Sequence, residues 1–295
     1  MKQTEKASAV LYILIIIFQL SASGTHLIAK SVTYELHPAL LMLLRATIAA
    51  TVYVIWMLFN RTKLIKIERS DWKKVLLLGL LNIPLNQFLF LTAVKLTTAP
   101  NVSLAYALTP AFVMILAISF FNEKASLQKI IGVLIAFSGT LFILFERGID
   151  LSSDNFWGFI IVLSASLFYA LYTIIGRDFS IKYGPIYSMG ITMISGWILF
   201  LPIFFITGVP IELSAISATN WLQVLYLGVI TSGVGYGLWY IILTRTEASK
   251  AAVFNNLEPV FTTILAVIIF ANAVTIPFML GGLLIIGGVI TTQRG

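Results

Sequence analysis

The sequence predicts an all-α integral membrane protein of ten transmembrane helices, arranged as two five-helix repeats of opposite orientation. An apolar composition, a succession of ten apolar runs and an internal repeat together predict this fold. Of the 295 residues, 59% are hydrophobic and 11% are charged, whereas soluble domains are roughly 45–50% apolar and 25% charged. A chain this apolar has too little polar surface to face water, so lipid is the solvent that fits it.

The composition also excludes several kinds of site. The chain has no cysteine and only two histidines, His26 and His37, so thiolate chemistry is excluded and we expect neither a metal nor another cofactor. The net charge of +7 could suggest nucleic acid. The basic residues, however, lie in short segments between apolar runs, which indicates membrane topology and no nucleic-acid partner.

Each apolar run is long enough to cross the bilayer, which takes about 20 residues. The first run continues to Ala29, so we interpret it as a span and not as a cleaved secretory signal. The predicted spans are 7–29, 38–59, 72–95, 99–121, 126–146, 156–180, 184–207, 219–245, 248–270 and 275–292.

The distribution of Lys and Arg predicts the orientation. If the N-terminus is inside, fifteen of the 19 basic residues lie in inner segments and three in outer ones, with Arg45 left inside a span. The positive-inside rule therefore predicts that both termini lie in the cytoplasm. We expect a multi-pass protein of a bacterial inner membrane.

An internal repeat divides the chain into 1–147 and 148–295. With a shift of 149 residues the halves align without a gap over more than sixty positions. Because each half has five spans, an odd number, the second half must be inverted in the membrane. Inverted repeats place a substrate site near the midplane and permit alternating access. Matching pairs include Trp72 with Trp221, Gly79 with Gly228, Pro110 with Pro259, Gly132 with Gly281, and Gly139 with Gly288.

A set of positions carries a family resemblance that covers essentially the whole chain. The chain resembles the drug/metabolite transporter superfamily, in its EamA-type ten-helix form. The positions are Gly24 in the first span, Arg45 in the second, Ala99-Pro100 at the start of the fourth, Leu108-Thr109-Pro110 within it and Glu123 at its end.

The resemblance implies export or exchange of small metabolites, often amino acids, with spans 1–4 and 6–9 around a cavity. The chain departs from the pattern at two places. Asn272 stands where the second half usually has its terminal acid, and Thr25-His26 stand where many relatives carry Ser-Asn. Both departures bear on the substrate and not on the fold.

Glu258 is one of two ionisable residues well inside a span, where each charge costs roughly 2.5–3.5 kcal/mol on insertion scales. Asn255 and Asn256 precede it, and Pro259 follows and is expected to free the carbonyl of Asn255. A carboxyl group there could bind a cationic group or take up a proton, which makes Glu258 the candidate for proton coupling. The alternative is a structural acid, but the repeat partner is the neutral Thr109, so we favour function.

Arg45 and His26 are the other candidates with ionisable side chains. Arg45 could hold a substrate carboxylate in a forked geometry, or it could pin loop backbone or pair with an acid such as Glu258; we favour the structural role. His26 could relay protons or form a hydrogen bond between helices. Its counterpart in the second half, at a shift of 146, is Tyr172, which we include in the predicted site.

The middle of the third span is polar and interrupted by Pro84, and its counterpart in 231–237 is rich in glycine. Interrupted segments at matching positions in both halves indicate a transporter site, although small residues also favour close helix packing. We therefore include Asn86 and Gln87 in the binding site. Tyr106, Trp239 and Tyr240 are candidate aromatic walls, and we also include Tyr236, from the glycine-rich segment, in the predicted site.

Glycines recur on the fifth and tenth spans and predict packing faces, which would also permit a homodimer. These residues are Gly132, Gly139, Gly281, Gly282, Gly287 and Gly288.

The function predicted from these features is secondary transport of a small molecule, and not enzyme activity. The sequence lacks the phosphate-binding motif G-x-x-x-x-G-K-[ST], so this chain does not hydrolyse ATP through that motif. The alternative is a membrane enzyme or carrier that acts on lipid or on nucleotide-linked substrates. Such an enzyme needs a clustered acid, base or metal set, and a channel needs a charged ring or filter loop; the sequence shows neither pattern.

Overall fold

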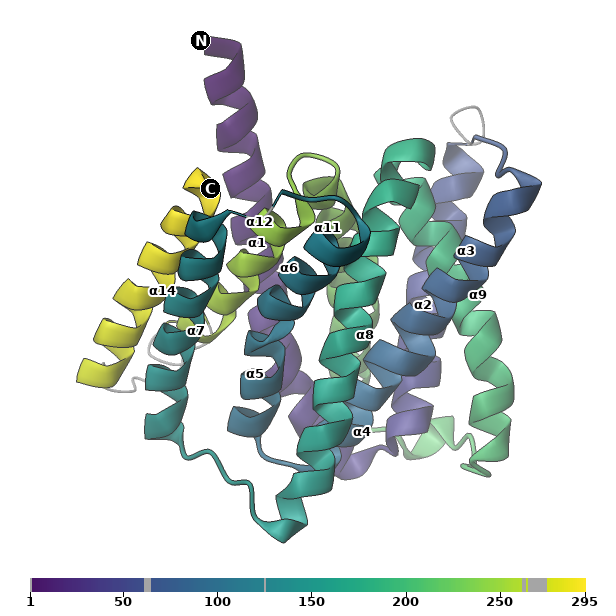
Figure 1. The fold of residues 1–295 in the computed structure, drawn as a ribbon. Helices are drawn as coiled ribbons and strands as arrows, with labels where there is room; N and C mark the ends of the chain where they lie inside the picture. Colours follow the sequence, from purple (N-terminus) through teal and green to yellow (C-terminus); the bar gives the residue numbers. More distant parts are fainter. Residues whose placement is uncertain (1, 61–64, 125, 262–263, 265–274) are drawn as a thin grey trace.

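The computed structural model describes residues 2–60, 65–124, 126–261, 264 and 275–295 (Figure 1). All regular elements in these ranges are helical, and nine helices among them are long and apolar enough to cross a bilayer. The predicted span 248–270 begins in the described part, but 262–263 and 265–270 lie outside it. Asn272, Arg61 and Lys63 also lie outside the described residues. The all-helical, two-repeat fold class is confirmed.

The first half of the chain contains five spans, of which the third and fourth are interrupted. The helix α1 (Lys2–Glu35) extends beyond the predicted end at residue 29 and stops just before Pro38, because the residue before a proline disfavours helical backbone. The remaining elements are α2 (Pro38–Phe59), the short η2 (Arg69–Asp71), the third span α3 (Trp72–Leu80), η3 (Leu81–Phe88) and α4 (Leu89–Leu96), the fourth span α5 (Ala99–Ala107) and α6 (Thr109–Phe120), and α7 (Leu127–Arg147).

The second half repeats this order. Its first helix, α8, is longer than predicted and also covers the polar residues at both ends of the apolar run. The elements are α8 (Ser153–Tyr183), α9 (Pro185–Ile206), the short η4 (Leu213–Ala215), the third span α10 (Ala218–Leu225), η5 (Tyr226–Gly235) and α11 (Tyr236–Leu243), then α12 (Ala248–Ala252) and η6 (Val253–Leu257), and finally α14 (Ile276–Arg294).

Polar caps and first-turn prolines start several of these helices. The His37 side chain accepts a hydrogen bond from the Ala39 amide at the start of α2, where Pro38 occupies the first turn. The hydroxyl groups of Thr98, Ser217 and Thr275 accept bonds from the third amide that follows each of them. Each cap satisfies a backbone donor that has no partner within the helix, so the sequence determines where these helices begin.

Both third spans contain a π-helical segment at the position where the sequence is interrupted. The segment η3 contains Pro84, which lacks a backbone donor, and η5 contains Gly228, Gly233 and Gly235. Segments of this kind are rare and frequently lie at functional sites. The prediction of matched irregular segments in the two halves is therefore confirmed.

The predicted glycine faces join α7 to α14, which lie side by side in Figure 1. A Cβ atom at Gly132 would come within 3 Å of Thr292 and Gly288, and one at Gly139 within 3 Å of Gly281 and Ile285. These glycines let the two backbones approach closely, as small residues do in membrane helices. Within the repeat, Gly132 corresponds to Gly281 and Gly139 to Gly288. The contact between Gly132 and Gly288 is therefore the symmetric counterpart of the contact between Gly139 and Gly281, as expected for two related halves.

Both chain termini lie at the same end of the molecule, which we call the terminal face (Figure 1). Because successive spans run in opposite directions, the connections that follow α2, α6, α8 and α11 also lie at this end. The terminal face therefore gathers connections from both halves.

Candidate functional site

A cavity lies between the two halves and has an empty volume of about 710 Å³, part of which is open to solvent. Both π-helical segments contribute to its wall. The lining residues are Phe18, Ser21, Ala22, Thr25, His26, Arg45, Asn86, Gln87, Phe90, Tyr106, Tyr169, Thr231, Gly235, Tyr236, Asn255 and Glu258.

The side chains of His26 and Glu258 meet at the cavity wall. Nδ1 of His26 lies 3.1 Å from Oε1 of Glu258, and the two side chains are 16% and 17% exposed. His26 also lies against the rings of Phe90 and Tyr106, at centroid distances of 5.1 and 5.8 Å. The sequence indicated each of these two ionisable residues separately and did not predict that they pair.

The segment before Glu258 is tightened into the 3₁₀ helix η6. The prediction that Pro259 frees the carbonyl of Asn255 is wrong, because the Glu258 amide donates to this carbonyl in a 3₁₀-type bond. Asn255 lines the cavity. Asn256 is fully buried and does not line it, and neither polar atom of its side chain has a hydrogen-bond partner among the described residues.

Arg45 is 2% exposed and begins a hydrogen-bonded chain that runs across the two halves. Its Nε donates to Oγ of Ser232 at 2.7 Å, and Ser232 donates to Oε1 of Gln87 at 3.0 Å. Gln87 in turn donates to Asn82. Glu258 was the acid suggested as partner if Arg45 has a structural role. The structure instead places Ser232 at hydrogen-bond distance from Arg45.

The charge of Arg45 is left without a carboxylate in the described part of the chain. One guanidinium nitrogen, Nη1, is buried with no hydrogen-bond partner among the described residues. A buried charge is costly unless it is paired and hydrogen-bonded. Because Arg45 also lines the cavity, an anionic group in the cavity would supply the missing counter-charge.

Asn86 links aromatic residues of the two halves. Its Nδ2 donates to the hydroxyl of Tyr106 at 2.8 Å and to the carbonyl of Ala165 at 3.0 Å. Its Oδ1 accepts a bond from the hydroxyl of Tyr236 at 3.0 Å. One amide side chain in η3 thereby holds two tyrosines of the cavity wall in place.

Two of the predicted aromatic site residues, Trp239 and Tyr172, lie behind the wall, as does the candidate wall residue Tyr240. Trp239 stacks on Phe18 and Tyr169, which do line the cavity, and its Nε1 donates to Thr173 at 3.3 Å. Tyr172 is fully buried, stacks on Tyr240 and donates to the sulfur of Met189 at 2.9 Å. Their large rings fill the space between helices and support the lining residues.

Sequence reasoning missed Tyr169 and the hydroxyl pair of Thr25 and Thr231. Tyr169 precedes Tyr172 by three residues on α8, and its ring lies 6.4 Å from that of Tyr236. The hydroxyls of Thr25 and Thr231 are 2.9 Å apart and join α1 to η5. The position of Thr231 in the glycine-rich segment could have indicated it, and Thr25 is the sequence neighbour of the predicted site residue His26.

The lining residues come from the first four spans and from the sixth, eighth and ninth. The resemblance also implied a contribution from the seventh span, α9, but α9 provides none of the lining residues. Instead α9 packs against α2 and α3. Gly79 of α3 and Gly196 of α9 face each other there, where an added Cβ would lie 2.6 Å from the opposite backbone.

Comparisons with known proteins agree with this architecture. A solved crystal structure superposes on the chain with a TM-score of 0.78, covers 98% of it and is itself covered to 97%, at 20% identity. This likeness shows the fold alone. An uncharacterised transporter from Bacillus subtilis, YyaM, is 26% identical over 96% of this chain and 93% of its own length. An uncharacterised transporter from Archaeoglobus fulgidus is 28% identical over 88% of this chain and 90% of its own length.

The model of the EamA-like transporter family matches the chain twice, over residues 9–145 and 156–293. The two matches cover nearly the whole sequence and fall on one half each. This chain therefore belongs to the EamA-like transporter family.

Proposed function

We propose that this transporter moves a small polar or amphipathic metabolite, an amino acid or a related compound, across a bacterial inner membrane by alternating access. The observation that carries the proposal is the charge arrangement of the cavity. Arg45 offers a cation without a carboxylate partner in the described part of the chain, and Glu258 offers an acid paired with His26. A solute with both an anionic and a cationic group fits such a pair of sites.

The lining aromatic rings support an amphipathic substrate. Phe18, Phe90, Tyr106, Tyr169 and Tyr236 provide apolar surface beside the two charged sites. An aliphatic or aromatic side chain of the substrate would bury surface against these rings, at a gain of roughly 25 cal/mol per Å².

Glu258 is proposed to carry a proton during the cycle, and transport is proposed to run outward. Its carboxyl group already lies 3.1 Å from His26, whose imidazole can donate or accept a hydrogen bond. Release of the proton to one side of the membrane and uptake from the other would couple substrate movement to the proton gradient. With the basic residues inside, the terminal face is cytoplasmic in this proposal.

A membrane enzyme acting on lipid or on nucleotide-linked compounds is the alternative. The charged residues of the cavity, His26, Arg45 and Glu258, come from three helices and lie beside a hydrogen-bonded scaffold of amides and tyrosines. This scaffold suits binding, whereas hydrolysis would need a positioned nucleophile and base. Turnover of a lipid by the purified protein would favour the enzyme.

A substrate screen in proteoliposomes tests the transport function. Labelled amino acids and related metabolites are loaded inside, and efflux is followed with and without a pH gradient. We expect one class of metabolite to leave these proteoliposomes faster than it leaves liposomes that contain no protein. The variant Ala22→Trp, which fills the cavity, should abolish this efflux, and the control Leu27→Trp, at a 46% exposed position of α1, should retain it. Equal flux in wild type and Ala22→Trp would contradict a transport role for this cavity.

A further inference from the structure

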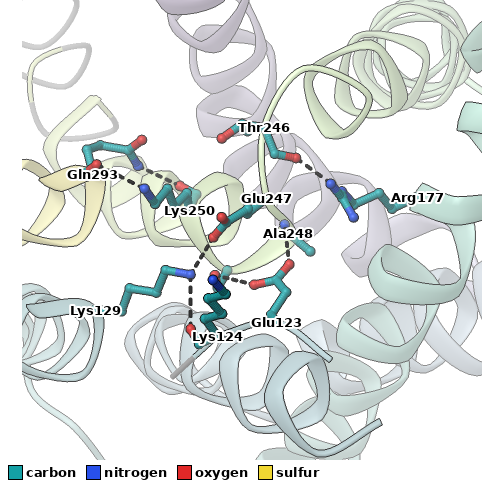
Figure 2. Close-up of polar contacts among 10 residues, drawn as sticks. Glu123, Lys124, Lys129, Arg177, Thr246, Glu247, Ala248, Lys250 and Gln293 are labelled. Carbon is teal, nitrogen blue, oxygen red and sulfur yellow. Dashed lines mark hydrogen bonds and ion pairs between the residues drawn. The ribbon is translucent and has the colours of Figure 1, made fainter. Parts of the chain in front are cut away.

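Polar contacts at the terminal face hold the connection between α11 and α12 to both halves of the protein (Figure 2). The carboxylate of Glu123, at the end of the fourth span, accepts a bond from the Ala248 amide at 2.8 Å and another from the Ser249 hydroxyl at 2.5 Å. It therefore binds the first turn of α12, where backbone amides lack partners and the helix dipole favours an anion.

A second contact between the halves lies beside the first. Lys129 of α7 pairs with the carboxylate of Glu247 and also donates to the carbonyl of Lys124 at 3.3 Å. Lys129 is only 2% exposed. Its buried ammonium group needs Glu247 as counter-charge, and a buried charge that loses its partner is strongly destabilising.

Other contacts attach the same connection to the second half. Nε of Arg177 donates to the carbonyls of Leu243 and Thr246, at 3.2 and 3.1 Å. Lys250 of α12 and Gln293 of α14 exchange bonds of 3.2 and 2.8 Å between side chain and backbone. Residues 243–250 are thus attached to the second half, whereas Glu123 and Lys129 belong to the first. A displacement of residues 247–249 away from Glu123 and Lys129 would therefore break both contacts.

The helix that receives these contacts also leads into the cavity. Ala248 begins α12, and Glu258, ten residues later, lines the cavity, a distance of about 15 Å along a helical path. The contacts therefore lie between the cavity and the terminal face, at the start of the helical segment that carries the proposed proton site.

We propose that Glu123 and Lys129, bound to residues 247–249, form a latch that closes the cavity toward the terminal face. This inference rests on the proposed carrier function, since a carrier must open this side in another part of its cycle. The latch joins two contacts that break together when residues 247–249 move away from Glu123 and Lys129. In sequence, Asn272 is the counterpart of Glu123 one repeat later, so the acid of the latch belongs to one half only.

Thiol labelling tests the latch without knowledge of the substrate. The chain has no cysteine, so Ala22→Cys places a single thiol in the cavity wall. A membrane-impermeant thiol reagent is applied to intact cells and to inverted vesicles. A separate variant, Gln128→Cys, at the exposed start of α7, identifies the preparation that presents the terminal face.

Labelling of Ala22→Cys from the terminal face should be slow in the otherwise unchanged protein. The labelling rate should rise about tenfold or more when Glu123→Gln or Lys129→Gln is added. A hydrogen bond to a charged group changes an equilibrium constant by more than a factor of ten, so its loss should favour the open form by at least this factor. Lys124→Ala is the matched control and should leave the rate unchanged, since Lys124 contributes a backbone carbonyl to the latch. The double exchange Lys129→Glu with Glu247→Lys should restore slow labelling.

Unchanged labelling in both Glu123→Gln and Lys129→Gln would overturn the latch, even if the protein transports a metabolite. Faster labelling in Lys124→Ala to the same degree would overturn it as well, because the effect would then be a general loosening of the terminal face. If no metabolite crosses in proteoliposomes, the carrier proposal fails, while faster labelling in the latch variants still supports closure by these residues.

Discussion

Nδ1 of His26 lies 3.1 Å from Oε1 of Glu258, which joins the first helix of one half to the fourth span of the other. The pair lies at the wall of a cavity that also contains Arg45. One side of this cavity can therefore receive a cation or a proton, while Arg45 can receive an anion.

Replacement of Arg45 should weaken binding of an anionic group. Arg45→Lys keeps the charge but loses the planar fork, and the two residues are not interchangeable at such sites. A hydrogen bond to a charged group contributes about 1.5–3 kcal/mol, so loss of the forked geometry should lower the substrate affinity by more than tenfold. Flux measured against substrate concentration checks this.

Ser232→Ala is the control for Arg45. It removes the 2.7 Å bond to Nε but leaves the guanidinium in the cavity wall, so the affinity should fall much less than in Arg45→Lys. Equal affinities in wild type and Arg45→Lys would show that Arg45 supports the fold and does not bind substrate.

The close contact of α7 and α14 should tolerate no added methyl group. In Gly132→Ala the new Cβ would lie 2.2 Å from the Thr292 hydroxyl, and overpacking of this kind costs about 1–3 kcal/mol. The melting temperature of the purified protein should fall. Gly282→Ala is the matched control on α14, because an added Cβ there meets nothing within 4 Å. A similar loss in both variants would contradict the packing account.

The latch should weaken at acidic pH through Glu247. Burial alone would raise the pKa of Glu247, but the bond and charge of Lys129, with the charges of Lys250 and Arg177, hold this pKa below its usual value. A carboxyl group whose pKa is lowered in the folded state stabilises that state above its usual pKa, and the contribution is lost as the pH falls through the lowered value.

Thermal unfolding of wild type and Glu247→Gln measures this contribution. The difference in melting temperature should be largest at about pH 7 and should shrink toward about pH 4, where carboxyl groups begin to take up protons. A difference that stays constant over this range would show that the charge of Glu247 does not stabilise the latch.

Much of the fold follows from local patterns that a single sequence displays. The apolar runs predict spans. Pro84 and the glycines of 231–237 predict irregular segments at matching places, because a proline without a backbone donor or a glycine without a side chain disturbs the helix in which it lies. The six glycines predict packing faces, but only contacts between helices reveal that four of them join α7 to α14 while Gly282 and Gly287 do not.

The candidate site was predicted in composition but not in arrangement. Eight of the eleven predicted residues line the cavity, whereas Tyr172, Trp239 and Asn256 lie behind its wall. The neighbouring helices determine which face of a membrane helix points into the cavity. The sequence therefore indicated Tyr172, whereas the residue of this helix that lines the cavity is Tyr169, three positions earlier. The pairing of His26 with Glu258 and of Glu123 with Ala248 joins residues far apart in the chain, which no local pattern predicts.

The most direct test of the central claim compares wild type with Glu258→Gln in proteoliposomes, using a metabolite that the wild type exports. Glu35→Gln serves as control, since this acid of α1 bonds to Asn220 and does not line the cavity. We predict that a proton gradient accelerates efflux in wild type and Glu35→Gln, and that Glu258→Gln loses the acceleration. An undiminished response to the gradient in Glu258→Gln would contradict the account.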